Sequence, residues 1–175
     1  LLDEMRGRGV EPNVISYSAA MAACGKAGEW ERALELMEEM RGYDIQPDAI
    51  SYNAAISACE KSAQWDRALE LLDEMRRGGL DPRVVSYNTA ISACAKGRQW
   101  ERALELLAEA HERNLCPDVI SYSAAIAACD KCGQWQKALE LLEEMRRHGI
   151  QPDKISYNAA ISACEVSGEI KKANA

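Results

Sequence analysis

The hydrophobic residues of this chain follow two alternating patterns. Between residues 30 and 40, apolar side chains recur with the i, i+3, i+4, i+7 spacing of a helix that buries one face, at Trp30, Ala33, Leu34, Met37 and Met40. The glutamates of this segment fall largely off that face. The preceding segment, Ile15 to Lys26, is rich in small and apolar residues and almost free of charge, which predicts a helix buried on more than one side. The sequence therefore predicts a pair of unlike helices.

This pair of patterns repeats every 35 residues. The period is marked by Trp30, Trp65, Trp100 and Trp135, by Tyr17, Tyr52, Tyr87, Tyr122 and Tyr157, and by Cys24, Cys59, Cys94, Cys129 and Cys164. A fixed period of this size indicates supersecondary units that bury their apolar faces only against one another. We therefore predict an all-α fold, an α-solenoid of antiparallel helix pairs forming a right-handed superhelix of helical hairpin repeats.

The period also divides the chain. Four complete repeats span residues 14–48, 49–83, 84–118 and 119–153, and residues 154–175 form a partial fifth repeat. Residues 1–13 correspond to the C-terminal part of a preceding repeat, because Leu1 to Met5 recurs as Leu71 to Met75. Since the chain starts and stops inside a repeat, without an initiator Met and without clear capping repeats, we expect a segment of a longer array. A targeting segment or flanking domain would then lie outside this sequence.

Turn residues separate the predicted helices. Gly28 suits a tight turn after the first helix, and Gly149-Ile150-Gln151-Pro152 is typical of the end of a second helix. The Asp or Asn after most of these prolines is expected to cap the first helix of the next repeat.

Composition changes the picture in two ways. Hydrophobic residues make up 47% of the chain, but no stretch approaches the run of about 20 apolar residues that a membrane-spanning helix needs. The net charge of −7 and pI near 5.0 are the opposite of the basic footprint expected of a nucleic-acid-binding protein. Most of the acids fall in the second helices, as in Glu31 to Arg41, whereas the first helices are nearly neutral.

Three recurring segments resemble the pentatricopeptide repeat, whose plain form has the same 35-residue period: Ile50 to Cys59, Ala68 to Met75, and Gly149 to Asp153. The tetratricopeptide repeat has a period of 34 and a Trp-x2-Leu-Gly-x2-Tyr signature, whereas Trp is followed here by x2-Ala-Leu. The resemblance covers the whole chain. It implies binding of single-stranded RNA at one base per repeat, in a mitochondrion or plastid, without enzymatic activity in this chain and without a cofactor.

The resemblance also implies the site residues. In the family, the second residue of each repeat packs against a base, which corresponds to Ile15, Ile50, Val85, Ile120 and Ile155. The fifth and last residues select the base, which corresponds to Ser18 with Asp48, Asn53 with Arg83, Asn88 with Asp118, and Ser123 with Asp153, while Asn158 has no partner in this chain. Ser with Asp resembles a guanine reader and Asn with Asp a uracil reader. Arg83 departs from the pattern because arginine accepts no hydrogen bond. The implied RNA site is 5′-GYUGY-3′.

These positions also have structural interpretations. Taken alone, β-branched residues on a helix that faces a neighbour are more typical of a core, and Ser or Asn near a helix start can serve in capping. The variation between repeats favours the functional interpretation, because it is concentrated at the fifth and last positions. Four lysines stand late in the first helices: Lys26, Lys61, Lys96 and Lys131. The resemblance implies that they contact phosphates. They would also offset the helix macrodipole.

The remaining side chains predict little chemistry. His111 and His148 stand 37 residues apart and share no repeat position, so we interpret them as surface residues. Five of the seven cysteines share one repeat position, which is typical of small core residues in a reducing compartment. Cys129 and Cys132 form one Cys-x2-Cys pair without a second pair at metal spacing, so no metal site is predicted.

Two classes of function remain. One is sequence-selective RNA binding in organellar RNA processing, stability or translation, which the periodic lysines and the coded positions favour. The other is a protein-interaction scaffold within an organellar multiprotein complex, which the acidic charge and the Asn53 with Arg83 pair favour. A repeat arm of an RNA-processing enzyme would differ from the first class only outside this chain.

Overall fold

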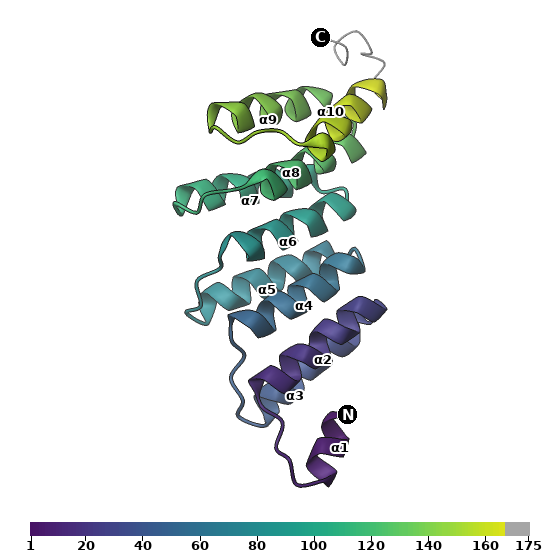
Figure 1. The fold of residues 1–175 in the computed structure, drawn as a ribbon, viewed down its shortest axis with the longest axis vertical. Coiled ribbons are helices and arrows are strands. Elements are labelled where there is room, and N and C mark those ends of the chain that lie inside the picture. Colours follow the sequence, from purple (N-terminus) through teal and green to yellow (C-terminus); the bar gives the residue numbers. More distant parts are fainter. Residues whose placement is uncertain (167–175) are drawn as a thin grey trace. The chain divides into compact units, whose positions relative to one another are not determined.

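The computed structural model describes residues 1–166, and over that range its secondary structure is entirely helical (Figure 1). It confirms the predicted all-α solenoid of helix pairs. The helices are α1 (Leu2–Gly7), α2 (Val14–Ala27), α3 (Trp30–Gly42), α4 (Ala49–Lys61), α5 (Trp65–Arg77), α6 (Val84–Lys96), α7 (Trp100–Glu112), α8 (Val119–Lys131), α9 (Trp135–Arg147) and α10 (Lys154–Val166). The last part of the predicted fifth repeat, residues 167–175, lies outside the described residues. Between residues 1 and 166 no helix has the length and hydropathy that a membrane span requires.

The helices form two compact units. The first, Leu1–Pro82, holds α1 to α5, and the second, which begins at Arg83, holds α6 to α10. In the first unit α2 packs against α4, and in the second α8 lies between α6 and α10. Each second helix packs against the first helix of its own repeat and, for α3, α7 and α9, also against the first helix of the next. Each unit therefore has a layer of first helices and a layer of second helices.

Small residues let the first helices approach closely. Ala55 and Ala58 of α4 are fully buried. A Cβ atom at Gly25 of α2 would lie only 3.0 Å from the Cα atom of Ala58, which is tighter than ordinary van der Waals contact. The apolar, uncharged composition of these helices is thus explained by burial against helices of neighbouring repeats.

The turn between the two helices of a repeat uses left-handed backbone. Gly28 has φ of 79°, as its predicted place in a tight turn requires. The same position is non-glycine in the next two repeats, where Ala63 has φ of 57° and Arg98 has φ of 58°. The tryptophans follow this turn as the first residues of α3, α5, α7 and α9, and all four are half-buried.

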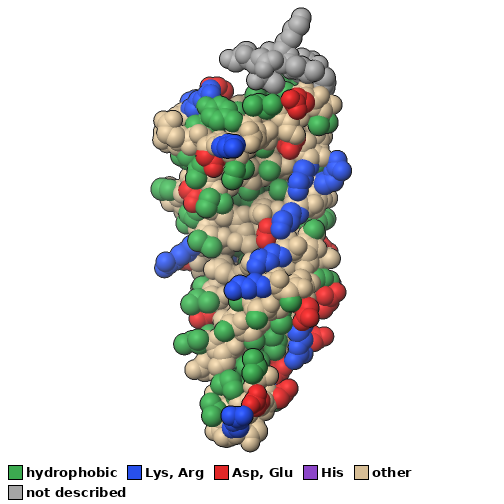
Figure 2. All heavy atoms as spheres, turned by 45° about the vertical axis from the view of Figure 1, so that its right-hand side comes forward, with side chains coloured by type: hydrophobic (Ala, Val, Ile, Leu, Met, Phe, Trp, Pro, Cys, Tyr) green, Lys and Arg blue, Asp and Glu red, His purple; other side chains and the backbone are tan. Residues whose placement is uncertain are grey.

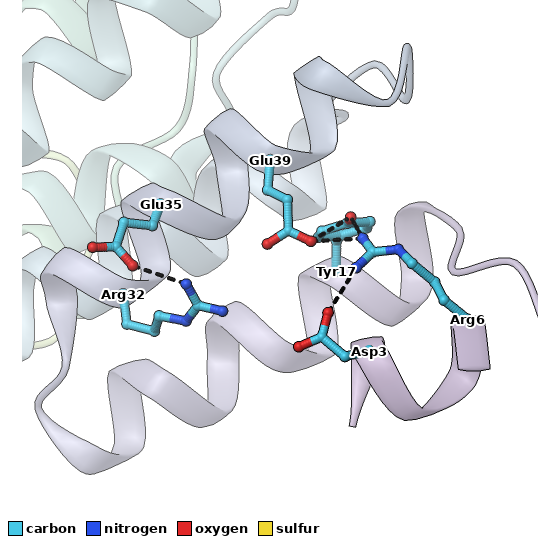
Figure 3. A network of polar contacts seen from close by, with 6 residues as sticks. All are labelled: Asp3, Arg6, Tyr17, Arg32, Glu35 and Glu39. Atoms are coloured by element: carbon cyan, nitrogen blue, oxygen red, sulfur yellow. Dashed lines mark hydrogen bonds and ion pairs between the residues drawn. The ribbon is translucent and has the colours of Figure 1, made fainter. Parts of the chain in front are cut away.

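Within each unit, polar clusters join second helices to the following repeat. In the first unit, the Arg6 guanidinium donates to the Tyr17 hydroxyl and to the Glu39 carboxylate at 2.6 Å, and Tyr17 donates to Glu39 at 3.1 Å (Figure 3). Arg6 also pairs with Asp3, three residues earlier, at 3.0 Å. Because Arg6, Tyr17 and Glu39 stand on α1, α2 and α3, the cluster fixes three helices.

The cluster recurs one repeat later. Arg41 donates to the Tyr52 hydroxyl at 3.0 Å and to Glu74 at 2.9 Å, and it pairs with Glu38. In the second unit Arg146 donates to Tyr157 at 3.1 Å, while His111 takes the position of the arginine and lies 3.0 Å from the Tyr122 hydroxyl. We call this arrangement the Arg-Tyr-Glu cluster, and His111 is the one departure from arginine at its first position.

The two histidines meet at this departure. His111 is half-buried and His148 is exposed, which agrees with the interpretation of surface residues. Their rings nevertheless stack with centroids 4.8 Å apart. The 37-residue separation gave no sign of this contact, because it joins different positions of two adjacent repeats.

Arg41→Ala should lower the free energy of unfolding by about 1–2 kcal/mol, since it leaves the buried Tyr52 and the half-buried Glu74 without their shared donor. The matched control is Arg32→Ala, which removes only the exposed ion pair with Glu35, seen in Figure 3, and should cost about 0–0.5 kcal/mol. Urea denaturation followed by circular dichroism measures both. Equal losses in the two variants would mean that the cluster adds nothing beyond a surface pair.

Burial controls the chemistry of the cysteines. Cys59, Cys94 and Cys129 are fully buried, and burial raises the pKa of each thiol to about 12. This agrees with their interpretation as small core residues. Cys132 is half-buried and donates from Sγ to the carbonyl oxygen of Arg98 at 3.2 Å, while Cys116 is exposed.

At pH 8, iodoacetamide should therefore alkylate Cys116 first and leave Cys59, Cys94 and Cys129 unmodified in the folded protein, because the reactive species is the thiolate. Timed quenching and peptide mass spectrometry give the rate at each site. The urea-denatured chain is the control, in which all seven cysteines should react. Modification of the buried thiols at the rate of Cys116 would contradict this assignment.

Candidate functional site

Five β-branched side chains at the second position of the repeats lie in solvent. Their exposed fractions are 76% for Ile15, 67% for Ile50, 63% for Val85, 60% for Ile120 and 63% for Ile155. The interpretation of these residues as core is therefore wrong. A single exposed apolar residue is ordinary, but the recurrence at one position of every repeat is not explained by chance exposure.

In the first unit these side chains border a groove between α2 and α4. The groove has a volume of about 580 Å³ and includes Ile15, Ile50, Ser18, Asp48, Asn53, Lys26 and Lys61 in its lining. It thus brings together residues of all three predicted kinds: base-packing, base-selecting and phosphate-contacting. On the face shown in Figure 2, hydrophobic (green), basic (blue) and acidic (red) side chains all lie among uncharged surface (tan).

The predicted selecting aspartates also cap helices. Asp48 Oδ1 accepts hydrogen bonds from the backbone N–H and the hydroxyl of Ser51, both at 2.9 Å, at the start of α4. Asp118 and Asp153 accept the equivalent bonds from Ser121 and Ser156 at the starts of α8 and α10. The predicted capping is confirmed, and it falls on the same carboxylates as the predicted base selection.

The fifth and last residues of a repeat meet although they stand 30 residues apart. Asn88 Nδ2 donates to Asp118 Oδ1 at 3.0 Å, and the Ser123 hydroxyl donates to Asp153 Oδ1 at 3.4 Å. In the first repeat the link is indirect, because the Ser18 hydroxyl lies 2.9 Å from the Ser51 hydroxyl that is bonded to Asp48. Ser18, Asn88 and Ser123 are buried, and the three aspartates are half-buried.

One oxygen of each aspartate remains for another donor. Within residues 1–166, every hydrogen bond to Asp48, Asp118 and Asp153 is accepted by Oδ1. Burial opposes ionisation of Asp118, but hydrogen bonds from Ser121 and Asn88 outweigh it and lower its pKa. Hydrogen bonds from Ser156 lower the pKa of Asp153. Asp118 and Asp153 are therefore ionised at neutral pH, with Oδ2 as a free acceptor.

The second repeat departs from this geometry. Arg83 stands at the N-cap position of α6, where its side chain is exposed and makes no capping hydrogen bond. Asn53 is half-buried and lines the groove of the first unit, and Asn158 of the partial fifth repeat is exposed.

The four lysines lie in the last turns of α2, α4, α6 and α8, and all are exposed. None of the ion pairs described within residues 1–166 involves Lys26, Lys61 or Lys131. Lys26 and Lys61 line the groove, so their charge lies beside the exposed isoleucines. At this position the fifth repeat has Val166, which is 73% exposed.

The acidic side chains of the first unit gather elsewhere. A second groove, of about 570 Å³, lies between α3 and α5 and is lined by Glu31, Glu35, Glu38, Glu70 and Glu74, with Arg41 and Arg67. The groove between α2 and α4 has one acidic residue, Asp48, in its lining. The net negative charge is thus concentrated on the second helices, as the sequence predicts.

Known families account for the repeats. The family model described as "PPR repeat family" matches residues 47–96, 82–131 and 117–165, and the one described as "Pentatricopeptide repeat domain" matches residues 1–62. A search of curated proteins found no match.

Solved structures share the fold. A crystal structure of the pentatricopeptide repeat protein PPR10 in complex with an 18-nt RNA element has 22% identity and a TM-score of 0.84, and the match covers 99% of this chain and 26% of PPR10. PPR10 from maize matches at 28% identity with a TM-score of 0.76, over 99% of this chain and 25% of PPR10. The PPR domain of Arabidopsis thaliana protein-only RNase P 1, in complex with tRNA, has 18% identity and a TM-score of 0.74, over 89% of this chain and 82% of that domain.

The chain thus spans about a quarter of the length of PPR10. The family matches together extend from residue 1 to residue 165. The chain belongs to the pentatricopeptide repeat family.

Proposed function

We propose that this chain binds single-stranded RNA at one base per repeat and acts by occupying the RNA, without catalysis. The observation that carries this proposal is the groove between α2 and α4, where two exposed isoleucines, a half-buried carboxylate and two lysines line one surface. The structures of PPR10 in complex with an RNA element and of the protein-only RNase P 1 domain in complex with tRNA support RNA as the class of ligand.

The groove has side chains that can contact the base and side chains that can contact the phosphate of a nucleotide. Ile15 and Ile50 are stiff β-branched side chains that lose little entropy when they pack against a flat base. The lysines at the far end of the same helices would neutralise phosphates and would make binding salt-dependent. Because the overall charge is −7, affinity should be weak in this segment alone. Because the attractive contacts are those of lysines with phosphates, affinity should fall steeply with salt.

The free carboxylate oxygens suit bases that present an N–H group. Guanine offers such a donor at N1 and uracil at N3, and either could meet an aspartate Oδ2. The fifth residue then sets the size of the base, since Ser18 and Ser123 leave more room than Asn88. This supports guanine at the first and fourth repeats and uracil at the third repeat of the proposed site 5′-GYUGY-3′.

The proposed setting is organellar RNA processing, stability or translation, in a mitochondrion or plastid. A site of this length recurs by chance too often to define one transcript among competing sites, so the parent protein would need more repeats. The fourfold greater length of PPR10 is consistent with that requirement.

A protein-interaction scaffold is the second candidate. The glutamate-lined groove between α3 and α5 favours it, since this surface would repel RNA but suits a basic segment of another protein. The two functions use opposite layers of the first unit, so each can be tested separately.

RNA containing 5′-GYUGY-3′ should bind more tightly than RNA with the purines and pyrimidines exchanged. Fluorescence anisotropy over a series of salt concentrations measures both affinities and the salt slope. The double variant Lys26→Ala/Lys61→Ala should weaken binding to both RNAs alike and reduce the slope, because these lysines are assigned to phosphates. Equal affinity for the two RNAs at moderate salt would contradict the base-selection proposal. If another protein but no nucleic acid co-purifies with the parent protein, the scaffold function is favoured.

Asn88→Ser should move the preference at the third position from uracil towards guanine, by about 1–3 kcal/mol, because it gives the third repeat the same selecting pair as the fourth. The reciprocal variant Ser123→Asn is the matched control and should move the fourth position from guanine towards uracil. Anisotropy with four RNAs that differ only at these positions reads out both changes. If neither variant shifts the preference, these residues serve only as structural partners of Asp118 and Asp153.

A further inference from the structure

The Arg-Tyr-Glu cluster changes its chemistry at one junction between repeats. At the sequence position of Arg6 the chain carries arginine four times, as Arg6, Arg41, Arg76 and Arg146, and histidine once, as His111. The acid that pairs with each of these arginines from three residues earlier, as Asp3 does with Arg6, is replaced there by Ala108. The position of Tyr43, whose ring lies under the Arg6 guanidinium, is taken by His148. His111 and Ala108 thus depart from the other repeats, and His148 stands at a position that varies between repeats, as Tyr43, Gly78 and Arg113 show.

The result is a group of three possible metal ligands. One ligand atom from each of His111, Glu144 and His148 lies within 4.8 Å of the others, and His111 Nε2 is 4.0 Å from Glu144 Oε1. Glu144 and His148 are one turn apart at the end of α9, where the His148 N–H donates to the Glu144 carbonyl at 3.0 Å. The helical backbone therefore fixes the spacing of two ligands, and α7 supplies the third.

We propose that His111, Glu144 and His148 bind a divalent transition-metal ion, of which Zn²⁺ is the best match. Two imidazole nitrogens and a carboxylate oxygen are typical zinc ligands, and a water would complete a tetrahedral shell. Ligand atoms around Zn²⁺ stand about 3.4 Å apart. Side-chain rotations that move the ligand atoms by roughly 1 Å would therefore bring them to coordination distance. The half-buried to exposed positions of the three residues leave room for that movement.

Charge supports the proposal independently of geometry. In the first two clusters the glutamate faces a permanent cation, Arg6 for Glu39 and Arg41 for Glu74. Within residues 1–166, the only ion-pair partner described for Glu144 is His111, at 4.0 Å. A bound dication would supply the positive charge that arginine supplies elsewhere.

The tyrosine of the cluster would then support the site. The Tyr122 hydroxyl donates to Glu144 at 3.0 Å and can orient this carboxylate toward a metal ion. His111 would turn its ring nitrogen away from Tyr122, to which it is now bonded at 3.0 Å. The metal would thereby join α7 to α9 and hold the third and fourth repeats together.

The test is titration of the chelator-treated chain with Zn²⁺ alone by calorimetry, with thermal unfolding in parallel. The protein should carry Cys24→Ser, Cys116→Ser and Cys132→Ser, so that no exposed or half-buried thiol competes for metal. We expect one Zn²⁺ per chain and a higher Tm in its presence. Absence of stoichiometric binding in this protein would overturn the proposal.

Two variants assign the ligands without disturbing the fold. His111→Arg and His148→Tyr each install a residue that another repeat carries at that position, as Arg6 and Tyr43 do. Each should weaken Zn²⁺ binding by at least about tenfold and abolish the rise in Tm. The Tm without metal should stay near that of the protein without this substitution. Unchanged binding in both variants would place the metal elsewhere. The Zn²⁺ measurements do not depend on RNA affinity, because neither His111 nor His148 is proposed to contact RNA.

Discussion

Within each unit, the close contact between the first helices of successive repeats is the constraint on which the other features depend. Helices that approach as closely as Gly25 and Ala58 must carry small, uncharged residues along most of their length. Charged side chains are then confined to the two ends of each first helix. The exposed isoleucines and valine occupy one end and the lysines the other. The layout of the proposed RNA groove thus follows from how the repeats pack.

Sequence alone predicted the features that are local or strictly periodic. The helix pairs, the capping by Asp48 and the core cysteines follow from spacing and side-chain chemistry within one repeat. The meeting of Asn88 with Asp118 was predicted only through the family resemblance, because nothing local relates residues 30 apart. Spacing could not decide whether Ile15 is core or surface, since a helix buried on more than one side has no clear polar face.

The polar clusters were missed for a different physical reason. Repeat analysis compares one position with itself, whereas Arg6, Tyr17 and Glu39 are three different positions on three helices. The stacking of His111 on His148 is of the same kind. A search for complementary residues at a constant offset, rather than for identical residues at the period, would have found the cluster, because Arg, Tyr and Glu recur at fixed separations.

The left-handed turns carry a consequence for how the array opens. Ala63 and Arg98 hold a conformation that costs a residue with a Cβ atom about 1 kcal/mol, whereas Gly28 holds it freely. That strain persists only while the two helices of the repeat stay packed on their neighbours, and separation of the pair releases it. The second and third repeats therefore contain strained turns, and the first repeat contains an unstrained one. The order in which the repeats unfold locally is then set partly by turn residues that touch no ligand.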